Sequence, residues 1–443
     1  MRLPFFHRAA TFEHGIHPVY HKETGALPIR RFPFAPRLIV PLSQHIGKPA
    51  LCCVSVGQEV LRGEVIATAD GMMSLPVHAP ATGVVEAIGL MPAANGKMVE
   101  SVTIRVYEAD GQEVRVSAPR DIEAMDKDEL LAAIQQTGIS GLGGATFPAH
   151  VKLNPPADAV IDTMVVNGAE CEPFLTCDHR VMVERTQDLI RGIRIAMKVS
   201  GAPRTVIGVE DNKPDAIAAI QAALPADGTI SVQALETKYP QGAEDTIIYA
   251  LLGREIPAGR RPASIGVLVN NVMTLAYLGR LLPAGEGMVE RVLTVAGPAV
   301  QKPGNYIVPI GTPLRFVLEQ AGAKSSASEV ILGGPMMGMT ISSLDVPVTK
   351  GTSGVLAFGK AAEAPRVYSC IKCGECVNVC PKFLNPSQLG LLAAKREYAL
   401  MAEQFNLDRC FECGCCSYVC PSHIPLVQQF RIAKAVNREK ATA

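Results

Sequence analysis

The spacing of hydrophobic positions changes along the chain and divides it into regions of different expected structure. Between about 37 and 115, short apolar runs such as 37–40 and 83–88 are separated by Gly and Pro. Short runs bounded by turn residues are typical of antiparallel β structure. Between about 125 and 285, apolar runs alternate with amphipathic stretches, and this alternation favours a layered, largely parallel α/β domain.

The α/β region yields specific predicted elements. Helices are predicted at 128–136, 183–199 and 214–224, and strands at 159–167, 205–209 and 264–269. From about 288 to 345, short strands and Gly-Pro turns return around a predicted helix at 313–321, which fits a small α+β module. A linker at 359–365 then leads into a cysteine-rich segment, and a short amphipathic helix is expected after Pro421.

Length and these changes of pattern predict a multidomain α/β protein. The chain has 443 residues, of which 48% are hydrophobic, so several cores can be buried. The predicted domains are 1–118, 119–287, 288–358 and 359–443.

Charge and hydropathy limit the expected binding partners and cellular location of the protein. Lys plus Arg number 42 and Asp plus Glu number 42, so there is no electrostatic reason to expect a nucleic-acid partner. The longest apolar stretch, 265–282, is interrupted by Asn270, Asn271 and Arg280, and the first residues are too short an apolar core for a secretory signal. We therefore expect a cytoplasmic protein that reaches a membrane only by binding other subunits.

Eight cysteines form two identical runs. The spacing C-x-x-C-x-x-C-x-x-x-C-P begins once at Cys370 and again at Cys410. This is the run of bacterial two-cluster ferredoxins, in which the fourth Cys of each run ligates the other cluster. The predicted ligands of the first [4Fe–4S] cluster are Cys370, Cys373, Cys376 and Cys420, and those of the second are Cys410, Cys413, Cys416 and Cys380.

A pair of zinc sites is the alternative for these cysteines, because CxxC ligand pairs also bind zinc. The complete run, present twice, favours clusters and so an electron-transfer protein. Cys415 lies outside the spacing and is predicted to be a packed core residue.

The segments 56–66 and 78–85 resemble a lipoyl- or biotinyl-type barrel-sandwich domain. Such carriers hold a modified Lys at a hairpin tip. Here the tip region contains Met72 and Met73 and no Lys. The predicted role is therefore that of a scaffold.

The segment 138–148 is a glycine-rich loop, Gly-Ile-Ser-Gly-Leu-Gly-Gly-Ala-Thr-Phe-Pro. Its glycines would let main-chain N–H groups approach a phosphate or a flat ring. It matches neither GxGxxG nor the Walker loop, and it follows a predicted helix instead of a strand. A flexible turn is the alternative interpretation.

Three further segments, 166–173, 239–246 and 270–275, follow the glycine loop in a recognisable order. Together they resemble the flavin- and NADH-binding subunit of respiratory complex I, and more closely the RnfC family of the Rnf ion-translocating complex. The resemblance covers nearly the whole chain. It implies a barrel-sandwich hybrid, a Rossmann-like FMN/NADH domain, a β-grasp module of the SLBB type and a two-cluster ferredoxin-like helical domain.

The resemblance also implies residue roles. Phe147, Glu170 and Glu172 would lie at the nicotinamide. Flavin or nucleotide contacts would come from Gly141, Gly143, Gly144, Thr146, Lys152, Asn167, Tyr239, Glu244, Asp245, Asn270, Asn271 and Thr274. The chain departs from the complex I pattern at Leu142, Ala169 and Cys171. The alternative interpretation makes Glu170 and Glu172 turn carboxylates, Lys152 a solvated residue and Tyr239 a loop cap.

The implied function is NADH oxidation, or NAD reduction, by an FMN and iron–sulfur subunit of a membrane complex that couples this reaction to ion translocation. Its implied partners are the ferredoxin-like B protein and the membrane proteins A, D, E and G of the Rnf complex, at the cytoplasmic face of the bacterial inner membrane. Two alternatives remain at this point. One is a flavin-free electron relay and docking subunit, and the other is an independent flavin enzyme with its own acceptor.

Overall fold

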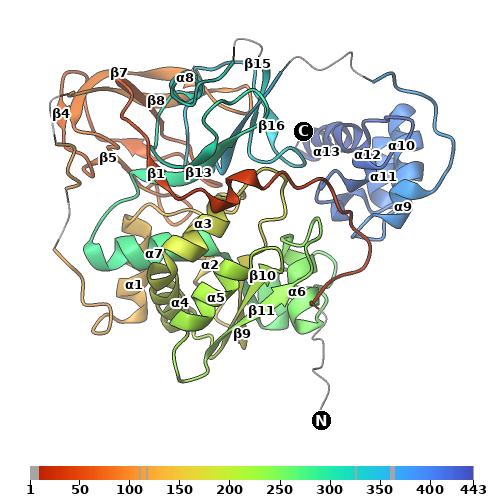
Figure 1. Cartoon of the computed structure of the whole chain (residues 1–443), viewed down its shortest axis with the longest axis horizontal. Helices are drawn as coiled ribbons and strands as arrows, with labels where there is room; N and C mark the ends of the chain where they lie inside the picture. The colour runs from red at the N-terminus through yellow and green to blue at the C-terminus, as the bar shows by residue number, and fades with distance from the viewer. Residues whose placement is uncertain (1–8, 109–110, 116–117, 325–326, 360–364, 443) are drawn as a thin grey trace.

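The computed structural model describes residues 9–108, 111–115, 118–324, 327–359 and 365–442. Four structural regions follow one another along the chain, and the C-terminal helices form a separate group beside the other three (Figure 1). Most of the linker predicted at 359–365 lies outside the described residues.

The first region is built from two small antiparallel sheets. One has the strand order β2-β8-β7-β4 and the other has the order β3-β5-β6. The strands are β2 (Arg37–Pro41), β3 (Leu51–Cys52), β4 (Glu59–Val60), β5 (Val65–Thr68), β6 (Val77–His78), β7 (Gly83–Pro92) and β8 (Met98–Val106). Their inward side chains, among them Leu38, Ile66 and Ile104, form one core, as the short alternating runs predict.

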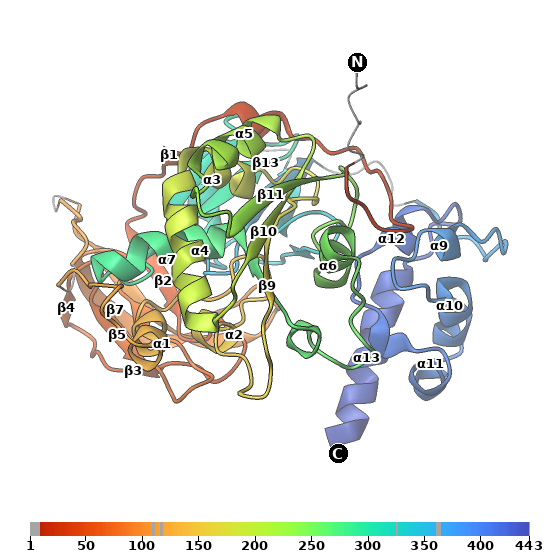
Figure 2. The same cartoon turned by 90° about the horizontal axis from the view of Figure 1, so that it is seen from below.

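The second region is a three-layer α/β domain. Its parallel sheet has the order β11-β10-β9-β12, with helices on both faces (Figure 2). The strands are β9 (Thr163–Gly168), β10 (Thr205–Glu210), β11 (Ile230–Leu235) and β12 (Val267–Asn271). The helices are α1 (Lys127–Gln136), α2 (Ala149–Lys152), α3 (Cys177–Glu184), α4 (Thr186–Ser200), α5 (Pro214–Ala223), α6 (Glu244–Leu252) and α7 (Val272–Ala284).

Alternation along β9 explains why this strand is apolar throughout. Met164 and Val166 belong to the core that also contains residues of α3, α4, α5 and α7, whereas Val165 belongs to the core beneath α6. A parallel strand covered on both faces has no solvent side to mark with polar residues.

Two predicted strands have different bounds in the structure. The strand expected at 159–167 begins only at Thr163, where pairing with Val267 starts, and Val160 is 84% exposed. The strand expected at 264–269 lies at Val267–Asn271, because Pro262–Ile265 forms a 3-10 turn that ends at Gly266 with φ +74°. The apolar stretch 265–282 is thus a buried strand followed by the buried helix α7.

The helix expected at 183–199 is confirmed as α4 over residues 186–199, but its predicted start was three residues too early. The structure has α3 and α4, which meet at Arg185, whose backbone is not helical (φ −128°, ψ 32°). The Thr186 hydroxyl donates to the Met182 carbonyl (2.6 Å) and satisfies the end of α3. An apolar period that continues across the break hides the break from the sequence.

The third region is a six-stranded mixed sheet of order β1-β14-β13-β17-β15-β16, packed on helix α8. Its elements are β1 (Arg30–Arg31), β13 (Glu290–Ala296), β14 (Gly304–Pro309), α8 (Leu314–Gln320), β15 (Ala327–Leu332), β16 (Met339–Thr340) and β17 (Gly354–Gly359).

The fourth region is helical. It contains α9 (Glu375–Asn378), α10 (Pro386–Ala394), α11 (Tyr398–Glu403), η3 (Leu407–Arg409), α12 (Cys415–Tyr418) and α13 (Leu426–Thr442). Leu389, Met401 and Phe430 are central to its core. The final helix is longer than the sequence pattern suggested.

Residues 9–32 form a strap that joins three of these regions. Ala10 bridges Leu235 at the edge of the parallel sheet, Ile16 bridges Tyr239, and Arg30–Arg31 pairs with β14 of the third region. Between them lies the short turn η1 (Glu23–Ala26). The strap runs from the helical region along the α/β domain towards the mixed sheet (Figure 1).

Candidate functional site

The parallel sheet places the predicted site at the point where its strand order reverses. From β9 the chain proceeds through β10 to β11 on one side, and β12 then pairs on the other side of β9. The carboxyl ends of β9 and β12 therefore flank the reversal, and Asn167 lies opposite Asn271 in the register. In open α/β sheets, ligands bind outside the carboxyl ends of the strands at this reversal.

The glycine loop packs against this point. The Leu142 N–H donates to Thr274 Oγ1 (2.8 Å), and the Asn271 side chain accepts from the Thr274 N–H (3.1 Å) as the N-cap of α7. A Cβ on Gly143 would lie 3.2 Å from the Asn271 side chain, so a glycine keeps the loop close to the helix. The loop and the positive end of the α7 dipole thus face the same space.

The part of the loop at Gly143 and Gly144 has the features needed to hold an anionic, flat group. Gly144 has φ +108°, and a Cβ there would meet nothing within 4 Å. Within the part of the chain that the structure describes, the main-chain N–H groups of Gly143 and Gly144 donate to no protein acceptor. Free N–H groups beside a helix N-terminus are suited to a phosphate-bearing ligand. Thr146 and Phe147 follow on the same loop, and the loop is closed where the Gly141 N–H donates to the Phe147 carbonyl (2.8 Å).

Several predicted residues converge across this space. The Lys152 ammonium at the end of α2 lies 3.5 Å from a carboxylate oxygen of Glu244 at the start of α6. The Asn167 amide donates to the Gly242 carbonyl (2.8 Å), which ties β9 to the segment before α6. Asn270 is buried, with its amide nitrogen against Met164 Sδ (3.7 Å).

The acidic segment after β9 is fixed by bonds from several directions. The two Glu170 carboxylate oxygens accept the N–H groups of Asp178 (2.9 Å) and His179 (3.1 Å) at the first turn of α3. Lys22 of the strap donates to the carbonyls of Glu170 (2.7 Å), Glu172 (2.7 Å) and Leu175 (2.5 Å). This geometry leaves Glu170 occupied by the helix terminus.

Glu172 contacts the third region. Its carboxylate oxygens accept the N–H groups of Met336 (3.0 Å) and Met337 (2.8 Å). Burial raises the pKa of Glu172 to about 7, although these two bonds act in the opposite direction.

Two more predicted residues reach the helical region. The Tyr239 hydroxyl donates to the Cys413 carbonyl (2.7 Å), and Asp245 forms an ion pair with Lys382. Burial raises the pKa of Tyr239 far above its ordinary value, so the phenol keeps its proton. The predicted pocket and the cysteine loops therefore meet at one junction.

The two cysteine runs adopt matching loops. Positive φ angles recur at equivalent positions, at Gly374 (87°) and Gly414 (82°), which precede the short helices α9 and α12. Such angles suit glycine because it has no Cβ. All thirteen cysteines are unpaired, so no disulfide competes for these thiols.

The thiols form two groups of four. The pKa of Cys376 is raised by burial and then by the neighbouring thiols of Cys373, Cys370 and Cys420. Burial likewise raises the pKa of Cys410 to about 11, and its thiol neighbours are Cys413 and Cys380. The thiols of Cys413, Cys410 and Cys380 also neighbour the thiol of Cys416. Each group mixes three cysteines of one run with the fourth of the other, a donor set suited to [4Fe–4S] clusters. Cys415 is fully buried with Ile16, Cys171 and Tyr239, and its thiol lies beside the thiol of Cys413.

Two residues near the site carry no sequence signal. Lys22 lies in an irregular segment, and only the fold brings its ammonium beneath the acidic segment. Asp178 accepts from the Asn271 amide (2.6 Å), and burial followed by the Glu170 charge raises the pKa of Asp178. Lys22 lies 148 positions from Glu170 in the sequence, and Asp178 lies 93 positions from Asn271.

One cavity of the described structure lies away from the predicted site. A cavity of about 470 Å³ lies between the first and second regions, beside His78 and Arg120, and holds none of the predicted site residues. Among the described residues, no helix combines the length and apolarity needed to cross a membrane.

Four sequence families match the chain in the predicted order. They are the RnfC barrel sandwich hybrid domain (residues 10–112), the Nuo51 FMN-binding domain (134–280), the SLBB domain (292–340) and the 4Fe-4S dicluster domain (369–424). These matches confirm the predicted fold class. Together with the donor sets above, they identify the cofactors as FMN and two [4Fe–4S] clusters, with NADH as substrate.

A solved structure supports the same fold. The chain is similar to a chain of an NAD⁺-reducing [NiFe]-hydrogenase in the air-oxidised state, with a TM-score of 0.52 and 19% identity. The match covers 73% of this chain and 68% of that chain.

Curated relatives extend over most of the sequence. The C component of the Na⁺-translocating ferredoxin:NAD⁺ oxidoreductase complex of Acetobacterium woodii is 43% identical over 85% of this chain and 86% of its own length. The proton-translocating counterpart of Clostridium ljungdahlii is 40% identical over 97% and 94%. The C component of the ion-translocating oxidoreductase complex of Haemophilus influenzae is 40% identical over 96% of this chain and 64% of its own length. The chain therefore belongs to the RnfC family, the C components of the Rnf ion-translocating ferredoxin:NAD⁺ oxidoreductase complexes.

Proposed function

We propose that this chain is the NADH-linked end of an Rnf complex, where electron pairs are exchanged with NADH and passed singly towards other subunits. The observation that carries the proposal is the junction at Tyr239, which belongs to the predicted flavin pocket and donates to the carbonyl of the cluster residue Cys413. A direct hydrogen bond thus joins the predicted pocket to the cluster loop.

The reaction balances as NADH giving NAD⁺, one proton and two electrons. When bound, FMN takes the two electrons of a hydride together and releases them one at a time, and each cluster carries one electron. The protein needs no general base for this exchange. Its task is to place the bound groups, exclude water and keep each site fixed relative to the next.

The residues divide this task. The free N–H groups of Gly143 and Gly144 and the N-terminus of α7 would hold the FMN phosphate region, with Lys152 as the nearby cation. Asn167, Asn271 and Thr274 fix the strand ends and the loop around it. Phe147, on the rim of the loop, would offer a ring for stacking.

The contacts between regions support an order for the two clusters. Three contacts from the strap and the α/β domain to the helical region fall beside ligands of one group. Gly15 N–H donates to the Val379 carbonyl (3.1 Å), Asp245 pairs with Lys382, and Tyr239 bonds Cys413. We call the cluster of Cys380, Cys410, Cys413 and Cys416 proximal, and the cluster of Cys370, Cys373, Cys376 and Cys420 distal.

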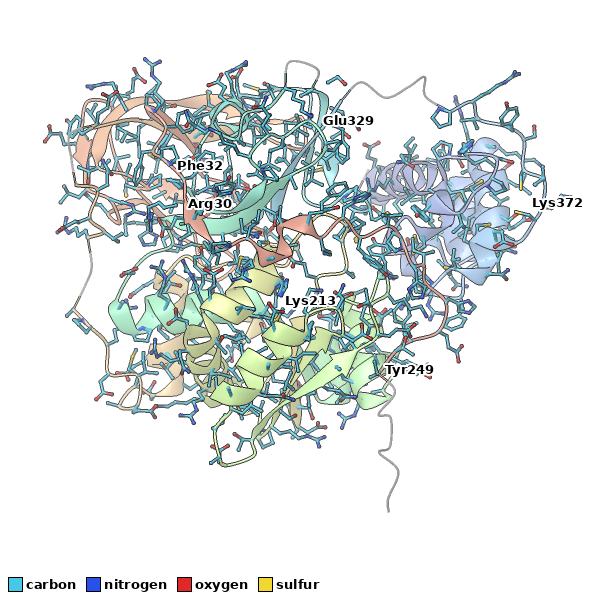
Figure 3. All side chains as sticks on the ribbon, viewed as in Figure 1. Arg30, Phe32, Lys213, Tyr249, Glu329 and Lys372 are labelled. Atoms are coloured by element: carbon cyan, nitrogen blue, oxygen red, sulfur yellow. The ribbon has the colours of Figure 1, made fainter. Side chains whose placement is uncertain are left out.

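The distal cluster faces away from the rest of the molecule. Lys372, inside its ligand loop, is at the outer edge of the helical region (Figure 3). In the same ligand loop, Ile371 is 68% exposed. Apolar side chains beside an exposed cluster are suited to docking a redox partner. The partners we propose are the ferredoxin-like B protein and the membrane proteins A, D, E and G of the complex, with this chain held peripherally on the cytoplasmic face of the inner membrane.

The test measures flavin and iron content and the visible spectrum before and after NADH addition. We expect about one FMN and about eight iron per chain, the content of one flavin and two cubane clusters, with bleaching by NADH. Iron without flavin, and no response to NADH, would leave a simple electron relay.

A matched pair of glycine variants localises the flavin. Gly144→Ala places a side chain at φ +108° in the glycine loop, and we expect loss of flavin with the iron retained. Gly201→Ala introduces the same kind of strain at φ +75°, at the C-cap of α4, and should keep the flavin. Equal flavin content in the two variants would contradict the assignment of the loop.

A further inference from the structure

The loop of residues 333–338, Gly-Gly-Pro-Met-Met-Gly, connects strands β15 and β16 in the third region and reaches the flavin–cluster junction. It is held at its base, where the Gly333 N–H donates to the Gly354 carbonyl (2.9 Å) and the Gly338 N–H to the Gly334 carbonyl (2.8 Å). These two main-chain bonds hold the loop in one conformation, and we call the loop of residues 333–338 the hook.

One side of the hook is bound to Glu172. Each carboxylate oxygen accepts one main-chain N–H, from Met336 and from Met337. A Cβ on Gly334 would overlap Glu172 Oε2, so only glycine allows this approach. Lys22 holds the Glu172 carbonyl from the other side (2.7 Å), so both partners of the contact are anchored.

The opposite side of the hook lies against the ligand loop of the proximal cluster. The Met336 carbonyl would lie 3.2 Å from a Cβ on Gly414, the residue that follows the ligand Cys413. The Met336 side chain packs against the buried group of Cys171, Tyr239 and Cys415. The same residue therefore touches the acidic segment and the ligand loop.

We propose that Glu172 is a positioning residue that clamps the 333–338 loop and, through it, fixes the proximal ligand loop against the flavin pocket. This inference rests on the proposed function. It gives the third region a role in the electron path without a cofactor of its own. It also assigns the Glu172 carboxylate to a contact between protein regions, in place of the nicotinamide contact that the family resemblance implies.

Two variants open the clamp from opposite sides. Glu172→Ala removes the acceptor, and Gly334→Ala pushes the loop away while leaving the carboxylate in place. Glu172→Gln is the conservative variant, because its amide oxygen can still accept one N–H. Met339→Ala, at an exposed position on β16, is the matched control. Flavin and iron content of each variant establishes that the protein has folded and is loaded.

The first readout does not depend on activity. Hydrogen exchange of the Met336 and Met337 amides should be about tenfold faster in both clamp variants than in the wild type, since the hydrogen bonds from these amides to the Glu172 carboxyl are lost. In Glu172→Gln, the exchange rate should lie between the wild-type rate and the rate in the two clamp variants. In Met339→Ala, it should equal the wild-type rate. Equal exchange in all of these proteins would overturn the clamp.

The second readout separates positioning from nucleotide binding. After NADH is mixed in, flavin bleaching and the paramagnetic signal of the proximal cluster are followed in time. Both clamp variants should bleach the flavin at nearly the wild-type rate and NADH affinity, with cluster reduction slower by about tenfold, because small displacements of a reacting group are costly. Loss of NADH affinity in Glu172→Ala, with wild-type behaviour in Gly334→Ala, would overturn the proposal and return Glu172 to the nucleotide. If NADH does not bleach the flavin of the wild-type protein, the proposed function is contradicted instead. The hydrogen-exchange measurement would still test the contact between Glu172 and the hook.

Discussion

The two ligand loops of the helical region have the same local structure and different surroundings. Gly374 and Gly414 have nearly equal φ angles, and Lys372 and Glu412 share a positive φ (58° and 65°) at the equivalent position. Yet a Cβ on Gly374 would meet nothing within 4 Å, whereas on Gly414 it would face Met336.

The same contrast extends to the cysteines. Cys373 is exposed, while its counterpart Cys413 is half-buried and accepts a hydrogen bond from Tyr239. The spacing of a motif thus determines how a loop folds around its cluster. In the proposed order, the protein surface that a ligand loop contacts determines which cluster lies next in the electron path, and this difference yields five tests.

The largest effect is expected from removing one ligand of each cluster. Cys413→Ser should abolish NADH-driven reduction of the distal cluster, because the proximal step is lost. Cys373→Ser should keep NADH-driven reduction of the proximal cluster. Each variant should keep about half of the iron. Electron paramagnetic resonance with iron analysis checks this, and a Cys373→Ser protein in which the proximal cluster stays oxidised would reverse the proposed order.

The next effect concerns the junction bond. Tyr239→Phe leaves the Cys413 carbonyl without its partner and should cost about 1–3 kcal/mol of local stability. The expected result is faster loss of the proximal signal in denaturant. Tyr418→Phe, at a 52% exposed position on α12, should change nothing. Equal effects in the two variants would contradict the conclusion that the bond from Tyr239 stabilises the Cys413 loop.

A paired glycine substitution compares the loops directly. Ala at Gly374 or Gly414 costs about 1–2 kcal/mol from the left-handed backbone alone. Gly414→Ala should lose more, because its Cβ also meets the Met336 carbonyl. Thermal unfolding of both loaded variants measures the difference, and a larger loss for Gly374→Ala would contradict the packing described.

The exposure of the ligand cysteines should also determine which of the two clusters is lost first. Under air or a chelator, the distal cluster should decay several-fold faster than the proximal one, because Cys373 is exposed and Cys416 is buried. Time-resolved paramagnetic spectra of the two clusters follow this decay. Simultaneous loss would mean that the helical region opens as one unit.

The smallest effect is a pH dependence at Glu172. Its ordinary pKa of 4.5 is raised to about 7 in the folded protein by burial. The folded state therefore retains a proton that the unfolded state releases, so this contribution to stability is complete below pH 4.5 and is lost as pH rises to about 7. Glu172→Gln should flatten thermal unfolding between these limits, while the exposed Glu375→Gln should keep the wild-type slope.

Much of the candidate site follows from local sequence. The twin cysteine runs, the glycine loop and the polar ends of β9 and β12 all fall where the motifs predict, because turn chemistry and ligand spacing are local properties. The partners of Glu172, Asp245 and Tyr239 could not be predicted. Each contacts a residue more than a hundred positions away, and no local period encodes such a distance.

By itself, the sequence determined the cluster-binding loops, the order of the domains and the likeness to a flavin-binding protein, since these depend on spacing within short segments. Only the tertiary structure decided that the Cys413 loop contacts Tyr239 of the predicted flavin pocket, and that Lys22 and Met336 contact the acidic segment beside it. The physical reason is that two loops with the same backbone preferences differ in free energy only through what packs against them. That packing is decided by the whole chain.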